Sequence, residues 1–387
     1  MRQAYNLLYL FLFLFFGAFT ACSQAGSNEK NEADATGVTG ADFHFSGLTP
    51  ESKSYYKARI EAAYHTILGP NFNGSILVAK NGEIIFEDYK GYADFRDKTP
   101  ITANTPFHLA SISKTFTGTT VLKLWQQGRL SLDDTLQKFF PTLPYPGISV
   151  RMLLSHRSGL PNYLYFFDSC WNKKVKASNE DVLNFMVQHK PRLDNQPNRN
   201  FHYCNTNYVL LAMIVEKITG MNYPQYMKDS VFTPLGMSHT FVFSAKDTSQ
   251  YVPTYIGNRP YPMDHLDCTY GDKNIYSTVQ DMFLWDKALY QHTFVSAATL
   301  DSAFTPQSLE KRSMHNYGLG WRLFTNAGDT IIYHNGKWHG SNTSFTRMVQ
   351  DTATIIVLGN KYNRMIYQSK RMADIFTGGH DINKLEE

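Results

Sequence analysis

Hydrophobic positions recur at two different spacings along the chain, and the two spacings follow one another in order. Residues 52–67 carry their apolar positions at the three-to-four-residue spacing of a helix. Two apolar runs, 74–80 and 83–89, then flank Asn81-Gly82, which is a turn signal typical of a β-hairpin. Helical spacing dominates the middle of the chain, and strand-like runs return near its end.

The middle of the chain predicts four helices whose ends carry recognisable signals. Ser178 is a suitable N-cap for the second helix, and Gly128 and Gly220 stop the first and the third. The four helices are expected at residues 114–127, 180–189, 206–219 and 278–290. Later strands are expected at 318–324, 330–334, 343–349 and 353–358, followed by an amphipathic helix at about 365–376.

Strands at both ends of a chain are most easily satisfied by one antiparallel sheet that takes strands from both. The helical middle would then form an inserted second lobe. We therefore expect an α/β (α+β) fold with one folded domain at 48–380. Its sheet lobe would comprise about 48–110 and 270–380, and its mainly helical lobe about 111–269.

The first residues predict an export signal rather than a part of the fold. Arg2 is the only charged residue among the first 28, and residues 7–21 form a run of low polarity. That run is short for a membrane-spanning helix, which needs roughly 20 apolar residues. A basic start followed by a short apolar run is typical of a signal peptide, which we assign to residues 1–21.

The apolar run ends at Cys22, directly after Thr20-Ala21. Small residues before a cysteine resemble the lipobox of bacterial lipoproteins. The resemblance implies that Cys22 is lipidated and begins the mature chain, and the alternative is an ordinary signal peptide. Residues 22–47 would form a flexible tether. We expect the protein in the bacterial cell envelope, held to the membrane by its lipid and facing the periplasm.

Composition narrows the class of protein. The 387 residues are 43% hydrophobic and 18% charged, which is typical of a globular chain. The net charge is +4, or +3 without residues 1–21, and this gives no support for a nucleic-acid partner. Four cysteines exclude a disulfide scaffold. Cys170 and Cys268 could pair, but the sequence alone assigns no disulfide.

Ser111 and Lys114 are three residues apart at the start of a predicted helix, so they share one face. A serine hydroxyl becomes a good nucleophile when a neighbouring base takes its proton, and a lysine one turn away can do so. The Ser-x-x-Lys spacing occurs four times in this chain, however, so alone it is a weak signal.

Two further motifs follow in order. Tyr203-Cys-Asn205 precedes the predicted helix at 206–219, and it offers a hydroxyl that can pass a proton and an amide that can hold a substrate. His334-Asn-Gly336 lies at the end of a predicted strand, where the glycine would let a substrate approach the strand edge closely. Each motif alone is more often structural than catalytic.

Taken together and in this order, the three motifs resemble those of the serine β-lactamase and penicillin-binding-protein superfamily. The most similar branch is that of the class C β-lactamase-related serine hydrolases, which includes esterases, D-aminopeptidases and D-Ala-D-Ala carboxypeptidases. The resemblance extends over roughly 55–377. It is also carried by the stretches 152–161, 234–240, 277–282 and 317–321.

The resemblance implies a role for each matching residue. Ser111 would attack a carbonyl carbon and form an acyl-enzyme, and Lys114 would act as its base or proton relay. Tyr203 would carry the proton to the leaving group and help to activate the deacylating water. Asn205 would orient a substrate amide. His334 would assist transition-state charge or a substrate carboxylate.

The same resemblance implies substrate contacts at Gly336 and an oxyanion hole made by the backbone N–H groups of Ser111 and Lys337. It implies no metal and no cofactor. Two positions depart from the family pattern. His334 stands where the family has lysine, and an imidazole is a weaker carboxylate anchor. Cys204 stands where serine is common, and we interpret it as packing.

Other classes fit the sequence less well. The thirteen histidines include no His-Glu-x-x-His, and no Gly-x-Ser-x-Gly elbow of an α/β-hydrolase is present. We expect an exported serine hydrolase, a monomer that acts on a small-molecule or peptide substrate: a D-amino-acid peptide, a β-lactam or a small ester. The alternative is a lipoprotein of the same fold that binds penicillin or peptidoglycan without turnover.

Overall fold

The computed structural model describes residues 43–377 apart from positions 247, 312, 327 and 328. The expected signal peptide, Cys22 and most of the expected tether lie outside the described residues. Within the described part, none of the helices combines the length and the apolar character needed to cross a bilayer.

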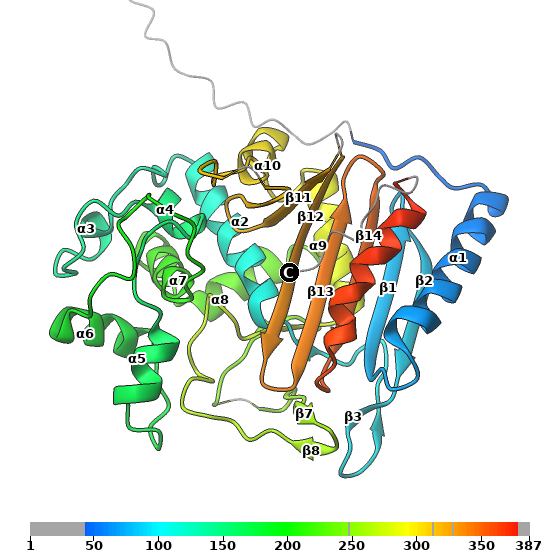
Figure 1. The fold of residues 1–387 in the computed structure, drawn as a ribbon, viewed down its shortest axis with the longest axis horizontal. Coiled ribbons are helices and arrows are strands. Elements are labelled where there is room, and N and C mark those ends of the chain that lie inside the picture. The colour runs from blue at the N-terminus through cyan, green and yellow to red at the C-terminus, as the bar shows by residue number, and fades with distance from the viewer. Residues whose placement is uncertain (1–42, 247, 312, 327–328, 378–387) are drawn as a thin grey trace, which may run out of the picture. The chain divides into compact units, whose positions relative to one another are not determined.

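One seven-stranded antiparallel sheet forms the centre of the described part, and it takes strands from both ends of the chain (Figure 1). The order β10-β11-β12-β13-β14-β1-β2 places the first strand beside the last. The strands are β1 Gly74–Lys80, β2 Glu83–Lys90, β10 His315–Tyr317, β11 Arg322–Asn326, β12 Asp329–Trp338, β13 Ser341–Met348 and β14 Ala353–Gly359. The sheet expected from the sequence is thereby confirmed.

Both faces of this sheet are covered, which explains the continuous apolar runs of its central strands. Along β1, Ile76 and Val78 enter the cluster under one face, whereas Leu77 and Ala79 enter the cluster under the other. One face contacts α1 (Pro50–Leu68) and a 3₁₀ helix at Arg364–Ile375. The other contacts α9 (Val279–Tyr290).

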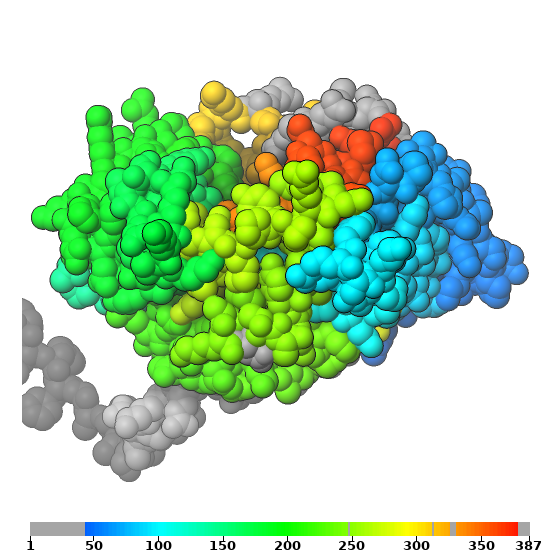
Figure 2. Space-filling view, turned by 90° about the horizontal axis from the view of Figure 1, so that it is seen from below, coloured from blue at the N-terminus to red at the C-terminus, as the bar shows by residue number. Residues whose placement is uncertain are grey.

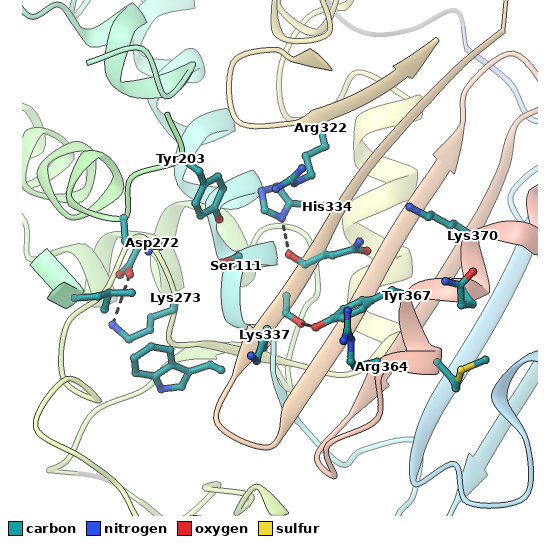
Figure 3. Close-up of a pocket in the computed structure, with 17 residues that line it drawn as sticks. Ser111, Tyr203, Asp272, Lys273, Arg322, His334, Lys337, Arg364, Tyr367 and Lys370 are labelled. Atoms are coloured by element: carbon teal, nitrogen blue, oxygen red, sulfur yellow. Dashed lines mark hydrogen bonds and ion pairs between the residues drawn. The ribbon is translucent and has the colours of Figure 1, made fainter. Parts of the chain in front are cut away.

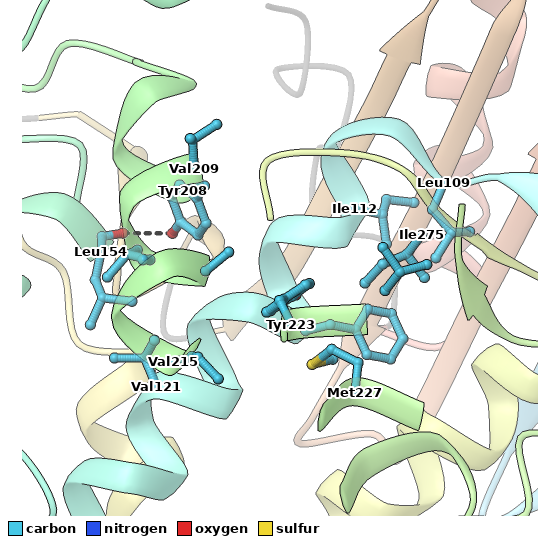
Figure 4. Close-up of a cluster of buried hydrophobic side chains, with 14 of the residues drawn as sticks. Leu109, Ile112, Val121, Leu154, Tyr208, Val209, Val215, Tyr223, Met227 and Ile275 are labelled. Atoms are coloured by element: carbon cyan, nitrogen blue, oxygen red, sulfur yellow. Dashed lines mark hydrogen bonds between the residues drawn. The ribbon is translucent and has the colours of Figure 1, made fainter. Parts of the chain in front are cut away.

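The helices of the other lobe pack around α2 and α7, which contact each other directly. In their core, the side chains of Val121, Val215 and Tyr208 gather, and the Tyr208 hydroxyl donates to the carbonyl of Leu154 at 2.8 Å (Figure 4). The helices are α2 Ser113–Gln126, α3 Leu136–Phe139, α4 Val150–Leu154, α5 Tyr163–Cys170, α6 Asn179–His189, α7 Thr206–Thr219, α8 Tyr223–Met227 and α10 Ala297–Ala303. Of these, α10 follows α9 and contacts α2.

An irregular segment at about residues 240–275 joins the helices to the sheet, and it covers the centre of the face seen in Figure 2. Its Tyr255 donates from N–H to Asn360 O at 2.7 Å and from its hydroxyl to Asp94 Oδ1 at 2.7 Å. On the helical side, His265 O accepts from Ala177 N–H at 2.7 Å. The remaining strands are β3 Tyr92–Asp94, β4 Thr99–Pro100, β5 Phe107–His108, β6 Phe241–Val242, β7 Tyr255–Ile256, β8 Arg259–Pro260 and β9 Ile275–Ser277.

Local signals predicted several elements correctly. Ser178 caps α6, in a reciprocal capping box with Asp181. Gly220 ends α7 with φ of 72°, in the left-handed region that favours glycine. Asn81 and Gly82 both have positive φ, as the two-residue hairpin turn between β1 and β2 requires.

Three predicted elements were wrong in extent or type. The strand expected at 318–324 is interrupted, because Gly318 and Gly320 bring the chain against other backbone: Gly320 N donates to Leu154 O, and its Cα approaches Gly118. The strand expected to end at His334 continues to Trp338, since β12 pairs with β13 along its whole second half. The last helix is of the 3₁₀ type.

Candidate active site

Ser111 lies in a 3₁₀ turn, Ala110–Ile112, that connects the short strand β5 to α2. The residue before it, Ala110, has φ of 50°, which a side chain other than glycine rarely adopts. The imidazole of His108 holds this conformation: its Nδ1 accepts from Ala110 N–H at 3.0 Å, and its Nε2 donates to Asn274 Oδ1 at 2.8 Å. Burial lowers the pKa of His108 to about 4, so the ring is neutral near pH 7.

The turn that carries Ser111 is pressed against the sheet. Thr343 Oγ1 on β13 donates to Leu109 O at 2.8 Å, and Leu109 N–H donates to Ile275 O on β9 at 2.8 Å. A Cβ on Gly336 would lie only 2.3 Å from Leu109 O and 2.2 Å from Thr343 Oγ1. Gly336 is therefore needed because the serine-bearing turn lies against β12. That a substrate approaches this strand edge at Gly336 stays a prediction.

Lys114 is fully buried, and its Nζ meets three acceptors from three parts of the chain. Nζ donates to Ser111 Oγ at 3.1 Å, to Asn205 Oδ1 at 2.8 Å and to the carbonyl of Asp272 at 2.8 Å. The structure thus brings together Ser111, Lys114 and Asn205. It also shows that the amide oxygen of Asn205 is engaged by the lysine.

Tyr203 lies beside this group, with its ring directed toward Ser111 (Figure 3). Lys114 Nζ lies 5.0 Å from the centre of the Tyr203 ring, and the guanidinium carbon of Arg322 lies 5.6 Å from it. Two cations against one aromatic ring stabilise its position, because the ring face is electron-rich. Tyr203 comes from the segment that leads into α7, and Arg322 begins β11.

His334 is buried and neutral. Its pKa lies well below the ordinary value of 6.5, because burial disfavours the charged ring and Arg322 and Lys114 add repulsion. Nδ1 donates to the carbonyl of Asn335 at 2.8 Å, so Nε2 is the acceptor for the Tyr317 hydroxyl at 3.2 Å. A neutral imidazole engaged on both nitrogens cannot anchor a carboxylate as an ammonium would.

These residues open onto a cavity of about 540 Å³, a size suited to a small substrate. Ser111, Tyr203, Asn205, His334, Gly336 and Lys337 all line it, as the sequence predicted. Its other lining residues are Leu164, Asp272, Lys273, Arg322, Asn335, Trp338, Arg364, Met365, Tyr367, Gln368 and Lys370.

The cavity carries an excess of positive charge that the sequence did not reveal. Asp272 is the one carboxylate in its lining, and it already faces Lys273 at 3.6 Å. Four more cations line the wall: Arg322, Lys337, Arg364 and Lys370 (Figure 3). They come from β11, from β12 and from the 3₁₀ helix, and they lie close together because the chain folds. An oxygen-rich anion is the ligand that such a lining attracts.

Among the described residues, three potential metal ligands lie together next to Trp338 of the cavity lining: Asp264, Asp267 and His339. Asp267 already accepts from Trp338 Nε1 at 2.6 Å and from His339 Nε2 at 3.0 Å. Although burial opposes it, hydrogen bonds from His339 and Trp338 hold the pKa of Asp267 at about 2. We interpret these contacts as a support for the turn between β12 and β13.

The three described cysteines are unpaired. Cys204 is fully buried, its Sγ donates to Leu160 O at 3.2 Å, and burial raises the pKa of the thiol to about 11. A thiol of this kind is unreactive at neutral pH. The interpretation of Cys204 as packing is confirmed.

The lowered pKa of His334 predicts a pH dependence of stability. At pH values between 6.5 and the folded-state pKa, the unfolded chain binds a proton that the folded chain does not. This residue therefore costs stability as the pH falls below 6.5, by up to about 1.4 kcal/mol per pH unit. The His334→Gln variant should show a shallower loss of unfolding free energy between pH 7 and pH 5, measured by denaturant titration. His65→Gln, on the exposed side of α1, should keep the wild-type slope. An unchanged slope in His334→Gln would refute the neutral assignment.

Comparison with known proteins agrees with this geometry. The family model described as Beta-lactamase matches residues 71–374. Penicillin-binding protein 4* of Bacillus subtilis (strain 168) is 34% identical over 315 residues, which cover 77% of this chain and 70% of that protein. Protein flp of Staphylococcus aureus (strain MRSA252) is 27% identical over 299 residues, which cover 74% of this chain but only 59% of that protein.

A solved structure shows the same fold. The penicillin-binding protein from Bacillus halodurans superposes with a TM-score of 0.71 at 22% identity, over 82% of this chain and 98% of that one. The matched family model spans nearly the whole described region, including the turn of Ser111, the segment of Tyr203 and strand β12. The resemblance inferred from three short motifs is confirmed, and the chain belongs to the β-lactamase family of serine hydrolases.

Proposed function

We propose that this protein is an exported hydrolase that forms an acyl-enzyme on Ser111 and cleaves an amide or an ester. The observation that carries the proposal is the 3.1 Å hydrogen bond between Lys114 Nζ and Ser111 Oγ at the edge of a cavity. Three other Ser-x-x-Lys sequences occur in the chain. The pair at 54 and 57 lies exposed on α1, whereas Lys114 is fully buried beside its serine.

In the proposed reaction, Lys114 acts in its neutral amine form: Ser111 Oγ attacks the carbonyl carbon as its proton passes to the lone pair of Lys114 Nζ. The C–O bond forms as the carbonyl becomes an oxyanion, which the backbone N–H groups of Ser111 and Lys337 would stabilise. Tyr203 passes the proton to the leaving amine or alcohol as the scissile bond breaks. A water molecule then repeats the attack on the acyl-enzyme, and Ser111 recovers its proton.

The charge of the cavity supports a substrate that carries a carboxylate. Because His334 is neutral, the substrate carboxylate would be bound by the cations around His334. Arg322 is the best placed of these cations, because it lies over the Tyr203 ring. A guanidinium presents two parallel N–H donors to a carboxylate, which favours both affinity and orientation. The proposed substrate class is therefore an acyl compound with a free carboxylate: a peptide, a β-lactam or a small ester.

The Ser111→Ala variant should lose turnover of activated esters, because Ser111 is the one serine among the described residues that line the cavity. Intact-mass spectrometry after incubation with a fluorophosphonate should show one adduct on the wild type and none on this variant. Ser54→Ala removes the exposed serine of the second Ser-x-x-Lys pair and should behave as wild type. An adduct on Ser111→Ala would disprove the assignment of the nucleophile. With penicillin as the probe, an adduct that persists without release would instead favour the alternative of a binding protein without turnover.

Arg322→Gln should weaken recognition of carboxylate-bearing substrates. Removing one charged hydrogen-bond partner costs about 1.5–3 kcal/mol, so KM should rise roughly 10-fold to 100-fold for an ester that carries a carboxylate. KM for the matching neutral ester should change little. Arg59→Gln, on the exposed side of α1, is the matched control. Equal changes in KM for both esters would exclude Arg322 as the anchor.

We also propose that the chain is attached to the cell-envelope membrane through a lipid on Cys22 and faces the periplasm. This rests on the apolar run at 7–21 and on the small residues before the cysteine. In a bacterial host, Cys22→Ser should move the protein from the membrane fraction to the soluble fraction. Cys170→Ser, which changes an exposed cysteine of α5, should leave it in the membrane fraction. Retention of Cys22→Ser in the membrane would contradict lipidation.

A further inference from the structure

His156 follows the C-cap residue of α4 and lies in contact with Tyr203. It is fully buried, and its ring stacks on that of Tyr203 with centres 4.2 Å apart and an angle of 33°. The rings of His156 and Tyr317 also meet edge to face, with centres 4.8 Å apart and an angle of 70°. The proposed reaction assigns no step to this histidine.

The backbone around Tyr203 is also held by His156. The residue before Tyr203 donates its N–H to the carbonyl of His156 at 2.8 Å, and the residue after it, Cys204, donates its N–H to Nδ1 of His156 at 3.1 Å. One residue therefore takes up both peptide N–H groups that flank Tyr203 and packs its ring on the tyrosine. Asn207, in the first turn of α7, adds a longer contact to the same nitrogen, at 3.4 Å.

These contacts require an unusual state of His156. Its φ of 55° lies in the left-handed region, which few residues other than glycine adopt, although His, Asn and Asp do so more often than the others. Because Nδ1 accepts a hydrogen bond, the neutral ring carries its proton on Nε2, which has no hydrogen-bond partner among the described residues. Burial and the charge of Lys114 lower the pKa of His156 well below its ordinary value, so the accepting form persists at neutral pH.

A strained backbone and a buried nitrogen without a partner both cost stability, and such costs concentrate where a site must be held rigid. Lys114, Arg322, Tyr317 and His334 contact the Tyr203 ring, whereas the two flanking N–H groups both donate to His156. Replacing the side chain of His156 would leave the Cys204 N–H unpaired and would free the Tyr203 ring to tilt, whereas the backbone carbonyl that accepts from the residue before Tyr203 would remain.

We propose that His156 is a positioning residue that fixes the Tyr203 ring and its flanking peptides, so that the tyrosine hydroxyl stays in reach of the leaving group. This inference rests on the proposed function of Tyr203 as the proton carrier. His156 acts only through Tyr203, and it touches neither the substrate nor Ser111.

Two variants separate its two contributions. His156→Phe keeps an aromatic ring against Tyr203 but removes the acceptor for the Cys204 N–H. His156→Asn keeps an acceptor on a residue that tolerates positive φ but removes the stacking ring. Both should lower kcat for an activated ester by up to ~10²-fold, as expected for a displacement of about 1 Å, with a much smaller change in KM. His189→Ala, at the exposed end of α6, is the control and should keep the wild-type kcat.

A double-mutant cycle with Tyr203→Phe is the decisive measurement. In the Tyr203→Phe background, each His156 variant should cause little further loss of kcat, because the group that it positions is already absent. Titration of Ser111 with a fluorophosphonate gives the concentration of folded active sites, so a variant that folds poorly is still scored per active molecule. A loss of the same factor in both backgrounds, or wild-type kcat in both single variants, would overturn the inference.

If the proposed function itself is wrong, the Ser111 and Tyr203 variants will show it independently of the His156 variants. If Ser111→Ala retained turnover, the proposed nucleophile would be wrong whatever the His156 variants do. If Ser111→Ala is inactive and Tyr203→Phe has wild-type kcat, Tyr203 carries no proton and the positioning role falls with it. If both are impaired and the His156 variants are not, only the inference about His156 fails.

Discussion

The buried amino group of Lys114 is the constraint on which the rest of the site depends. A polar group without access to water is costly unless its hydrogen bonds are made, and a lysine has three to donate. Here the three acceptors are Ser111, Asn205 and the carbonyl of Asp272. They come from the turn before α2, from the N-cap residue of α7 and from the loop before β9. Satisfying one side chain therefore fixes the helical lobe, the nucleophile and the loop between the lobes relative to one another.

The sheet forms the opposite wall of the cavity, and here the constraint is the close approach of the Ser111 turn to β12. The turn of Ser111 can lie against β12 only because Gly336 has no side chain, and Thr343 on β13 ties that turn to the sheet. Lys337, the next residue of β12, lines the same cavity as Ser111. Backbone strain at Ala110 and at His156 is consistent with a site whose geometry is maintained against local preference.

The sequence predicted those features whose signals are local. Helices with caps, such as α6 and α7, and a hairpin with an Asn-Gly turn could be placed because neighbouring residues determine them. The sheet built from both ends followed from the order of the elements. Ser111, Lys114, Tyr203 and Asn205 were found because their spacing and order resemble a known family, and the structure brings them into one cluster.

Features that depend on packing between distant segments could not be predicted. Gly318 and Gly320 break the expected strand because Gly318 lies against Ala303 at the end of α10 and Gly320 lies against α2 and α4. The cations of the cavity lie on β11, β12 and the 3₁₀ helix, and nothing in their spacing along the chain marks them as neighbours. The sequence also did not predict two features of the site: the neutral state of His334, which its burial causes, and the contacts of His156 with both neighbours of Tyr203.

The most direct test of the account replaces Lys114 with a side chain of similar length that cannot hydrogen-bond. The rate at which a fluorophosphonate modifies Ser111 should be followed by intact-mass spectrometry in the wild type and in Lys114→Met, with circular dichroism to confirm folding. If Lys114 activates the serine, the rate should fall by roughly 10²–10⁴-fold, the usual contribution of a positioned base. Modification of folded Lys114→Met at the wild-type rate would contradict the central claim.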